Sequence, residues 1–261
     1  MTEPNGGGRV RPPVRPAAAR SASRRRPRRK VTLVGVLGEL LITAGVLVLL
    51  FLGWQLWFND LVVDGQLEAE SSAQQHSWSR DKPTTTPVSA DDPPVPAVVG
   101  HAQTFALLIV PRFGADYIRP IAEGTGTTDV LNTGRIGHYP SSQMPGEIGN
   151  FAIAAHRMAY GRTFERNNEL VIGDHIFVET HEGWYQYSFR NLEFVKANGV
   201  GVVAPVPQST AAPTQRLLTM TTCNPKWTWQ ERIIAYSVFD TFYPRADGPP
   251  SEIAATVAAA S

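Results

Sequence analysis

Residues 216–223 read RLLTMTTC, and residues 232–239 read RIIAYSVF. Apolar and β-branched residues dominate both runs, and a polar, tryptophan-containing loop separates them, which predicts two antiparallel strands. Pairing across that loop puts Cys223 roughly opposite Arg232, with Cβ atoms about 5 Å apart when the two residues pair directly. Because side chains alternate between the two faces of a strand, Cys223 lies with Thr221 on the more polar face, at the strand's end. Strand ends rimmed by loops are where functional sites are usually built.

Runs of the same kind recur through the central part of the chain. The further candidate strands are Phe105–Val110, Tyr117–Ala122, Asn150–Ala155, Asp174–Thr180 and Trp184–Val195. Helical periodicity is scarce there, and only Thr127–Thr133 and Thr163–Leu170 fit a turn or two of helix. About seven short strands with Gly, Pro and polar breaks predict a mainly β domain over residues 100–243, either a closed or nearly closed β-barrel or a sandwich.

The N-terminal region combines a basic head with a long apolar segment. Residues 1–30 hold ten of the 24 Lys and Arg residues and one of the 23 acidic residues, which leaves the rest of the chain with a formal charge of −8. Residues 31–58 are mostly apolar, and Leu40–Phe58 comes close to the ~20 residues that a helix needs to cross a bilayer. Lys and Arg keep their end of a span in the cytoplasm. The pattern therefore predicts a basic cytoplasmic segment over 1–30, a single retained transmembrane anchor over 31–58 in the cell membrane, and an extracellular remainder.

A cleaved signal peptide and a nucleic-acid-binding arm are the alternatives for this region. A signal peptide has a shorter apolar region followed by a small-x-small site, and residues 31–58 meet neither condition well. No aromatic residues are interleaved with the arginines, which abut the predicted span. Orientation and attraction to anionic lipid explain the cluster, so we expect a membrane partner and no nucleic-acid partner.

Two further segments have the composition of unpacked chain. Residues 59–99 are predicted to form an extracellular stalk or linker. Within it, Asp60–Glu70 could be a short helix, whereas Ser71–Val99 is rich in Ser, Thr, Pro, Gln and Asp and suits an extended linker. Residues 244–261 are rich in Pro and Ala and are predicted to form a disordered tail.

Cys223 is the only cysteine of the chain, so an internal disulfide is excluded. A free cysteine is usually a buried packing residue, and an arginine at the start of a strand is often only a surface residue. The position of Cys223 on the polar face, opposite Arg232, favours reactivity instead. A guanidinium there would favour the thiolate and could hold a developing oxyanion.

A nucleophilic thiol needs a group that takes up its proton, and the chain has six histidines. His156 is the best placed, because it ends the small apolar run Phe151–Ala155 and precedes a polar loop at the expected rim of a barrel. His138, in a loop before a proline, stays an alternative. Of the other histidines, His76 falls in the stalk and His101 at its end. His181 falls in an expected hairpin turn, and His175 begins a strand after a Gly-Asp turn. A cysteine paired with a histidine distant in sequence is the general pattern of cysteine acyl transfer.

Metal and nucleotide chemistry have little support in the sequence. It contains no H-E-x-x-H motif, and His175 and His181 straddle a predicted hairpin with no thiol nearby. Gly124-Thr125-Gly126 is too short for a phosphate-binding loop and reads as a turn. We therefore expect no metal site and no cofactor.

The candidate residues match a known pattern. Ala155-His156-Arg157, followed by Tyr160-Gly161 and Phe164, then Thr219-Met220-Thr221-Thr222-Cys223 and Arg232, resembles the sortases, and most closely the class E sortases of actinobacteria. The resemblance covers about residues 104–240. Met220 stands where leucine is typical, and Ala155 where glycine often precedes the histidine. Exchange of Leu for Met conserves volume.

The resemblance implies a fold and an activity. The fold would be a sortase-like closed β-barrel of about seven to eight strands with one or two short helices, preceded by one transmembrane helix. Cys223 would attack the Thr–Gly carbonyl of an LPxTG-type or LAxTG-type sorting signal in a secreted protein and form a thioester. His156 would move protons, Arg232 would hold the oxyanion or the signal, and Thr221 would line the groove. The accepting amine would come from a peptidoglycan precursor.

A noncatalytic protein is the alternative. A stalked β-barrel ectodomain could bind cell-wall glycan or peptide and bury Cys223 in its core. The two hypotheses differ in one observable feature, which is whether the thiol is accessible.

Overall fold

The computed structural model describes residues 32–54, 59–80 and 92–260, in two compact units, Met1–Val48 and Leu49–Ser261. The first unit contributes most of helix α1 (Leu33–Gly53), whose start is capped by Thr32 Oγ1, which accepts a hydrogen bond from Gly35 N. Within the described ranges, α1 is the one helix long and apolar enough to cross a membrane, with a mean hydropathy of 2.5. The predicted basic segment 1–30 and the end of the predicted anchor, 55–58, lie outside the described residues.

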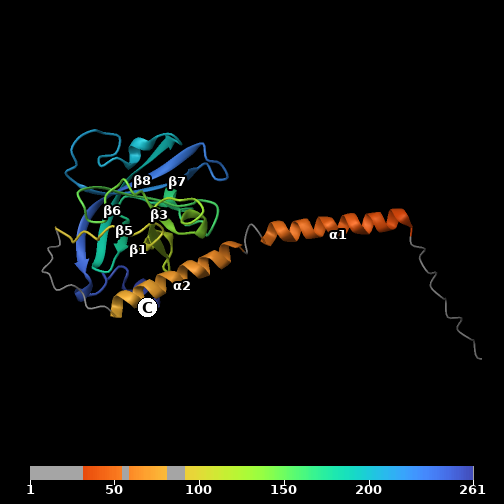
Figure 1. The fold of residues 1–261 in the computed structure, drawn as a ribbon, viewed down its shortest axis with the longest axis horizontal. Helices are drawn as coiled ribbons and strands as arrows, with labels where there is room; N and C mark the ends of the chain where they lie inside the picture. The colour runs from red at the N-terminus through yellow and green to blue at the C-terminus, as the bar shows by residue number, and fades with distance from the viewer. Residues whose placement is uncertain (1–31, 55–58, 81–91, 261) are drawn as a thin grey trace, which may run out of the picture. The chain divides into compact units, whose positions relative to one another are not determined.

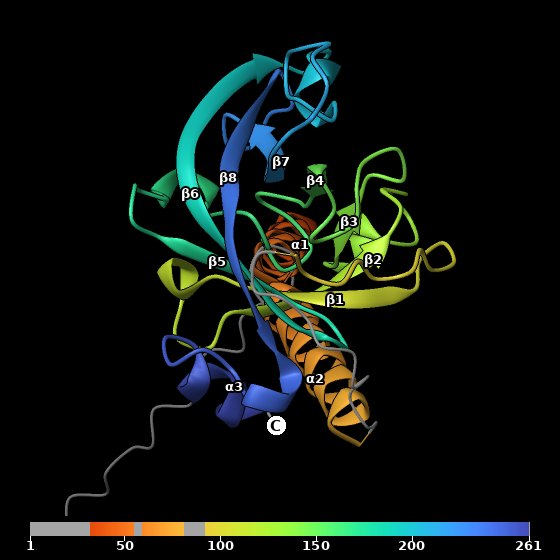
Figure 2. The same cartoon turned by 90° about the vertical axis from the view of Figure 1, so that its left-hand side faces the viewer.

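The second unit contains a closed barrel of eight strands in the order β1-β2-β3-β4-β7-β8-β6-β5. Figures 1 and 2 show how these strands are arranged in space. The strands are β1 Thr104–Ile109, β2 Ile118–Glu123, β3 Ile136–His138, β4 Gly149–Ala154, β5 His175–Glu179, β6 Gly183–Lys196, β7 Arg216–Asn224 and β8 Glu231–Pro244. The predicted closed β-barrel is therefore confirmed, and the sandwich is not what forms. Each of the seven predicted strands overlaps an observed strand.

The pair β7–β8 has the predicted arrangement. The two strands are antiparallel, and Cys223 is the register partner of Arg232, just as Thr221 is the partner of Ile234. Leu218 and Met220, on the opposite face of β7, are fully buried in the main core of the barrel. The alternation along β7 thus separates a core face from the face that carries Cys223.

Strand β4 lies parallel to β7 on the other side from β8. Ala154 is the register partner of Thr221, and the strand ends are tied further by Thr222 Oγ1, which donates to the carbonyl of Ala155 at 2.8 Å. Parallel neighbours end at the same edge of a sheet, so the residues that follow β4 emerge beside the end of β7. This is how the fold brings His156 to the cysteine across a long sequence separation.

The short elements were harder to predict. Strand β3 has three residues and was not predicted, because so short a run carries no alternating pattern. It packs against its neighbour closely, since a Cβ added at Gly137 would lie 2.5 Å from the Gly124 carbonyl. The expected helical turns at Thr127–Thr133 and Thr163–Leu170 shrink to the 3-10 turns η3 (Leu131–Thr133) and η4 (Asn167–Glu169). The remaining 3-10 turns are η2 (Pro111–Phe113), η5 (Val200–Val203) and η6 (Arg245–Asp247).

The extended linker predicted for Ser71–Val99 is wrong over its first part. Helix α2 runs from Asn59 to Arg80 and packs on β2. One stripe of α2 is buried and spaced like a helix face, namely Val63, Leu67, Ser71, Gln75 and Trp78. Polar Ser71 and Gln75 interrupt the apolar part of that stripe, which is why composition alone pointed to an unpacked segment. The remaining linker residues 81–91 lie outside the described residues.

Buried polar groups explain why Gln75 sits on the packed face. Gln75 Nε2 donates to Glu179 Oε2 at 2.7 Å, and Arg245 Nη2 donates to Glu179 Oε1 at 2.9 Å. The Arg245 guanidinium also lies over the rings of Trp78 and Trp184, 5.3 and 4.7 Å from their centroids. Burial raises the pKa of Glu179 above its usual range, and Arg245 opposes that shift.

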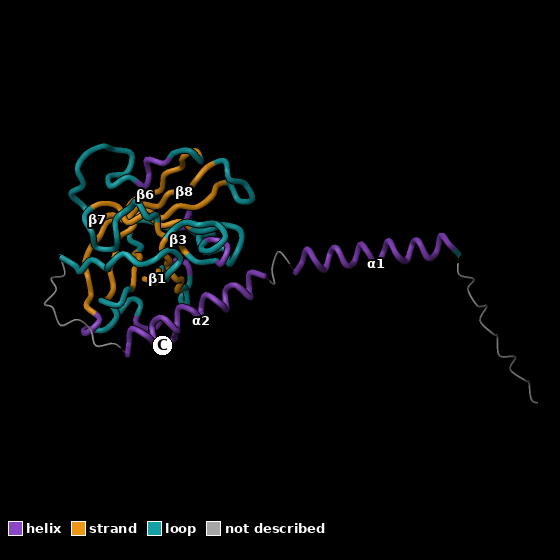
Figure 3. The backbone as a smooth tube through the Cα atoms, in the orientation of Figure 1, coloured by secondary structure: helices purple, strands orange, loops and turns teal. Residues whose placement is uncertain are grey.

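The C-terminal tail predicted to be disordered over 244–261 is also different in the structure. It forms η6 and then helix α3 (Ala254–Ala260), and residue 261 lies outside the described part. Ile253 and Val257 are buried in a second core with Trp78 and Trp184. Figure 2 labels α3, which contacts α2, and Figure 3 shows α2 in purple beside the strands and loops of the barrel. The Ala-rich composition of the tail did not predict this packing, because the tail contributes only Ile253 and Val257 as buried residues of the second core.

Candidate active site

One pocket of about 290 Å³ collects every site residue predicted from the sequence. Its walls are Thr125, Leu131, Tyr139, Ala154, Ala155, His156, Thr221, Thr222, Cys223 and Arg232. The thiol, the imidazole and the guanidinium come from the ends of β4, β7 and β8. The structure therefore brings together Cys223, Arg232 and His156, with Thr221 beside them.

Cys223 is partly exposed and unpaired. It is the next-to-last residue of β7, on the strand face away from the main core, where the chain is about to enter the β7–β8 loop. A cysteine that serves only for packing would be fully buried. Cys223 instead lines the pocket and is partly exposed.

Arg232 begins the returning strand opposite Cys223. Its Nη1 donates to the carbonyls of Trp229 and Glu231 at 2.8 and 2.9 Å, which ties the guanidinium to its own loop. Among the described residues, neither Nε nor Nη2 of Arg232 has a hydrogen-bond partner. These N–H groups are therefore available to an oxygen that binds in the pocket.

His156 follows β4 by two residues, and its backbone carbonyl accepts a hydrogen bond from Phe164 N at 3.0 Å. The imidazole Nε2 lies 2.9 Å from Asn132 Oδ1, and its ring is tilted against Tyr160 at 5.3 Å between centroids. Since an amide oxygen only accepts, Nε2 carries the hydrogen and Nδ1 keeps a lone pair when the ring is neutral. Burial lowers the pKa of His156 below its usual value, so the ring is mostly neutral at pH 7.

Two polar residues of the site were not found from the sequence. Asn132 lies on η3 and orients His156, and Tyr139 follows β3 and lines the pocket. Thr221 Oγ1 donates to the Ile153 carbonyl at 3.3 Å and lies 3.0 Å from the Tyr139 hydroxyl, which therefore donates to it. The only available signals were weak, namely an Asn in an expected helical turn and a Tyr before a proline.

His138, the alternative to His156, belongs to the core and not to the pocket. Its ring is buried between Phe105 and Phe151, with Nδ1 2.7 Å from Glu123 Oε2. Its Nε2 faces the Gln143 carbonyl at 3.1 Å and therefore donates to it. Such a ring has no free lone pair for a substrate.

The other four histidines do not line this pocket. His101 pairs with Asp129, His175 with Glu252 and His181 with Glu182, while His76 lies on α2. Within residues 32–54, 59–80 and 92–260, no group of three His, Cys, Asp or Glu side chains is arranged to hold a metal ion.

The connection between β6 and β7, which contains η5, is anchored to the sheet. Asn150 is fully buried, and its Nδ2 donates to the carbonyls of Val202 and Ala204 at 3.1 and 3.0 Å. Its Oδ1 accepts a hydrogen bond from Thr219 Oγ1 at 2.6 Å. Both polar atoms of this amide are satisfied, so Asn150 fastens the segment around η5 onto β4 and, through Thr219, onto β7.

A larger cavity of about 440 Å³ lies elsewhere, between α2 and the loop after His156. It contains none of the predicted site residues. Its charged walls pair with one another, since Arg162 binds Asp60 and Arg119 binds Asp64. The chemistry therefore resides in the smaller pocket.

Comparison with known proteins identifies close relatives. The model of the sortase domain family matches residues 108–239. Sortase E1 of Streptomyces coelicolor is 34% identical over 249 residues, which is 93% of this chain and 67% of the relative, and sortase E2 of that organism is 31% identical over 224 residues, or 82% and 85%.

Solved structures give the same result. The SrtA sortase from Actinomyces oris has 41% identity and a TM-score of 0.59, over 62% of this chain and 93% of that chain. Sortase E1 from Streptomyces coelicolor with a tripeptide in the active site has 35% identity and a TM-score of 0.55, over 58% and 97%.

Proposed function

The chain belongs to the sortase family of cysteine transpeptidases, and we propose that it cleaves a sorting signal of the LPxTG or LAxTG type between Thr and Gly and joins the new carboxyl end to a cell-wall amine. The observation that carries this proposal is the single pocket that contains Cys223, His156 and Arg232. Each of the three supplies a group that acyl transfer requires.

In the first half-reaction the Cys223 sulfur adds to the Thr carbonyl carbon while His156 takes the thiol proton. The carbonyl oxygen becomes an oxyanion, which would bind to the unused N–H groups of Arg232. When the C–N bond to glycine breaks, His156 returns the proton to the leaving amine. A thioester on Cys223 results.

In the second half-reaction the amine of a peptidoglycan precursor attacks the thioester carbonyl. His156 accepts a proton from that amine, the oxyanion forms again, and the Cys223 thiolate leaves. Water in place of the amine gives hydrolysis. The lowered pKa of His156 supports this role, because a neutral imidazole is the form that accepts a proton in each half-reaction.

We further propose that α1 anchors the enzyme in the cell membrane as a single span with the N-terminus in the cytoplasm and the barrel outside. The length and apolar composition of α1 support this placement, as do the ten basic residues that precede it. Secreted proteins that bear sorting signals would then reach the pocket on the outer side.

The noncatalytic alternative required Cys223 to be buried in the core. Cys223 instead is partly exposed in a pocket with a histidine and an arginine. No observation therefore favours a purely binding ectodomain.

The test is a transfer reaction with the full-length chain in detergent. Peptides that contain LPxTG, LAxTG or a scrambled signal are incubated with a second peptide that has a free amine, and the products are identified by mass. The expected products are the fragment through Thr joined to the amine and the released Gly fragment, with none from the scrambled signal.

Two variants complete the test. Cys223→Ala should abolish both products, whereas Met220→Leu, which changes a core residue to one of equal volume, should leave the rate unchanged. Cleavage by Cys223→Ala at the wild-type rate, or no cleavage of either signal by the wild-type chain, would contradict the proposal.

A further inference from the structure

Arg157, the residue after His156, is a buried cation without a counter-charge. Only 8% of the surface of Arg157 is exposed to solvent. In the part of the chain that the structure describes, no carboxylate lies within ion-pair distance of its guanidinium. Buried charges are ordinarily paired, because removing a charge from water is costly. An unpaired guanidinium at this position therefore requires a reason.

All the hydrogen-bond acceptors of Arg157 are neutral, and two of them belong to the cysteine end of β7. Nη1 donates to Asn224 Oδ1 at 2.7 Å and to the Cys223 carbonyl at 3.4 Å, and Nη2 donates to Asn168 Oδ1 at 3.0 Å. Nε is buried and has no hydrogen-bond partner among the residues that the structure describes. The positive charge is thus held next to the backbone of Cys223 and is not neutralised there.

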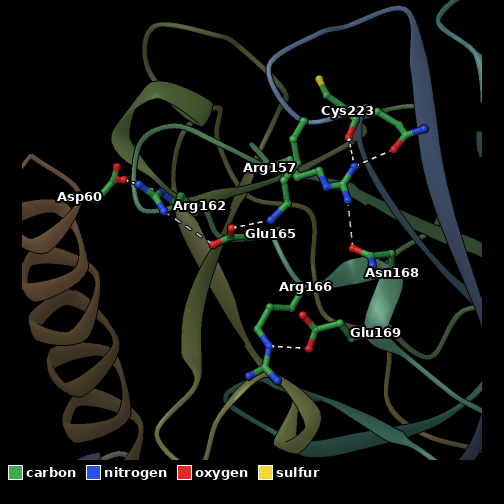
Figure 4. Close-up of polar contacts among 10 residues, drawn as sticks. Asp60, Arg157, Arg162, Glu165, Arg166, Asn168, Glu169 and Cys223 are labelled. Atoms are coloured by element: carbon green, nitrogen blue, oxygen red, sulfur yellow. Dashed lines mark hydrogen bonds and ion pairs between the residues drawn. The ribbon is translucent and has the colours of Figure 1, made fainter. Parts of the chain in front are cut away.

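Figure 4 shows how these groups lie. The Cys223 carbonyl oxygen points toward the Arg157 guanidinium, while the sulfur points away from it. Arg157 therefore contacts the strand end from the side opposite the thiol and does not touch the reacting atoms. Its backbone continues directly from His156, so one residue connects the histidine end of β4 with the cysteine end of β7.

We propose that Arg157 is a positioning residue of the acyl-transfer site, whose charge favours the Cys223 thiolate and whose planar fork fixes Cys223 and Asn224 relative to His156. This inference rests on the proposed function for its kinetic part only. A guanidinium is suited to both tasks, because it stays charged at all accessible pH values and its donors are rigidly spaced. A lysine in its place would keep the charge and lose the fork.

Other charged groups also act on this thiol. His156 and Arg232 face it in the pocket, Glu231 accepts a hydrogen bond from Asn224 Nδ2, and Lys226 pairs with Glu165 further along the β7–β8 loop. The carboxylates of Glu231 and Glu165 disfavour a thiolate and Arg232 favours it. Arg157 differs from Arg232 in being buried, so water screens its charge less.

The effect of the Arg157 charge on the Cys223 thiolate is tested by alkylating the full-length chain with iodoacetamide over a range of pH. Because the chain has a single cysteine, the reaction reports the Cys223 thiolate alone. We expect Arg157→Met to raise the pH midpoint of alkylation by about one unit or more, as removal of a nearby opposite charge does. Arg157→Lys should stay close to the wild-type midpoint. Asn168→Ala, which removes one partner of Arg157 at an exposed position, should also leave the midpoint unchanged.

The positioning role of the planar Arg157 guanidinium is tested by the kinetics of sorting-signal cleavage. We expect Arg157→Lys to lower kcat about tenfold while KM stays within twofold, because the charge remains but the hold on Cys223 and Asn224 is lost. Thermal unfolding of each variant shows whether the fold survives. If Arg157→Met does not fold, the split between kcat and KM in Arg157→Lys decides the proposal.

Two results would overturn the inference. One is an alkylation midpoint in folded Arg157→Met equal to that of the wild type, and the other is an unchanged kcat in Arg157→Lys. The alkylation arm uses no peptide, so it gives its answer even if the chain processes no sorting signal. Loss of the proposed function and loss of the role of Arg157 are therefore distinguishable.

Discussion

Cys223 and Arg232 are direct register partners at the end of the β7–β8 pair that the connecting loop closes, and both line the same pocket. Antiparallel partners point to the same side of a sheet, so the thiol and the guanidinium share one face without any contribution from distant loops. Arg232 also holds the carbonyls of Trp229 and Glu231 through Nη1. The remaining donors of Arg232 belong to the same pocket as the thiol.

Replacement of Arg232 should impair chemistry more than stability. Arg232→Ala removes the proposed oxyanion donors and should lower kcat/KM about 10²–10³-fold, the usual effect of losing such a donor. Arg232→Lys should restore only part of the lost kcat/KM, because an ammonium lacks the planar, paired donors of a guanidinium. Steady-state kinetics with a sorting-signal peptide measure both. Equal kcat/KM for Arg232→Lys and the wild type would show that the planar geometry is not used.

The contact between Asn132 and His156 should set the pH dependence. Burial lowers the pKa of His156, so the acid limb of kcat/KM, where the ring becomes protonated, should lie below the usual histidine range. Asn132→Asp puts a carboxylate beside Nε2, which favours imidazolium and should move the acid limb to higher pH by about one unit. Asn132→Ala serves as the neutral control and should move the limb less. An acid limb that is identical in Asn132→Asp and the wild type would contradict the assignment.

Asn150 should control the mobility of the segment that contains η5. Asn150→Ala leaves the carbonyls of Val202 and Ala204 without their donor, and the buried Val202 bond alone accounts for a cost of ~1–3 kcal/mol. We expect faster hydrogen exchange of amides near η5 and a lower free energy of unfolding. Val200→Ala, at a side chain 76% exposed in the same segment, is the control and should change neither. Exchange rates in Asn150→Ala that match this control would show that the segment is held by other contacts.

Trp78 should decide whether α2 stays on the barrel. Trp78→Ala removes a buried indole and its contact with Arg245, and we expect the free energy of unfolding to fall by ~3–5 kcal/mol. Limited proteolysis should then cut within α2 before the barrel. Trp227→Ala, which truncates an indole 66% exposed, is the matched control and should stay within ~0.5 kcal/mol of the wild type. Resistance to proteolysis equal to that of the control would mean that α2 is held mainly through Gln75 and Asp64.

Most of the barrel was predictable because its strands carry local patterns. The alternation in β7 and β8 fixed which face holds Cys223, and the pairing across the loop placed Arg232 opposite. His156 could be chosen from its position after β4, although only the parallel β4–β7 pair, which involves residues far apart in sequence, brings it to the thiol.

The features that were missed depend on tertiary contacts. Helix α2 buries Ser71 and Gln75, whose polarity hid the packed stripe, and Gln75 is there because Glu179 across the interface needs a partner. Asn132 gains its role only from contact with His156, and Arg157 only from contact with Cys223 and Asn224. No local pattern distinguishes such residues from other polar residues in loops.

The most direct test is the intact mass of the full-length protein during turnover of an LPxTG or LAxTG peptide without added amine. We expect an adduct with the mass of the peptide through Thr, located on Cys223 by peptide mapping, released by hydroxylamine and absent from Cys223→Ala. Product formation with no adduct on Cys223, or an adduct at another residue, would contradict acyl transfer through this thiol.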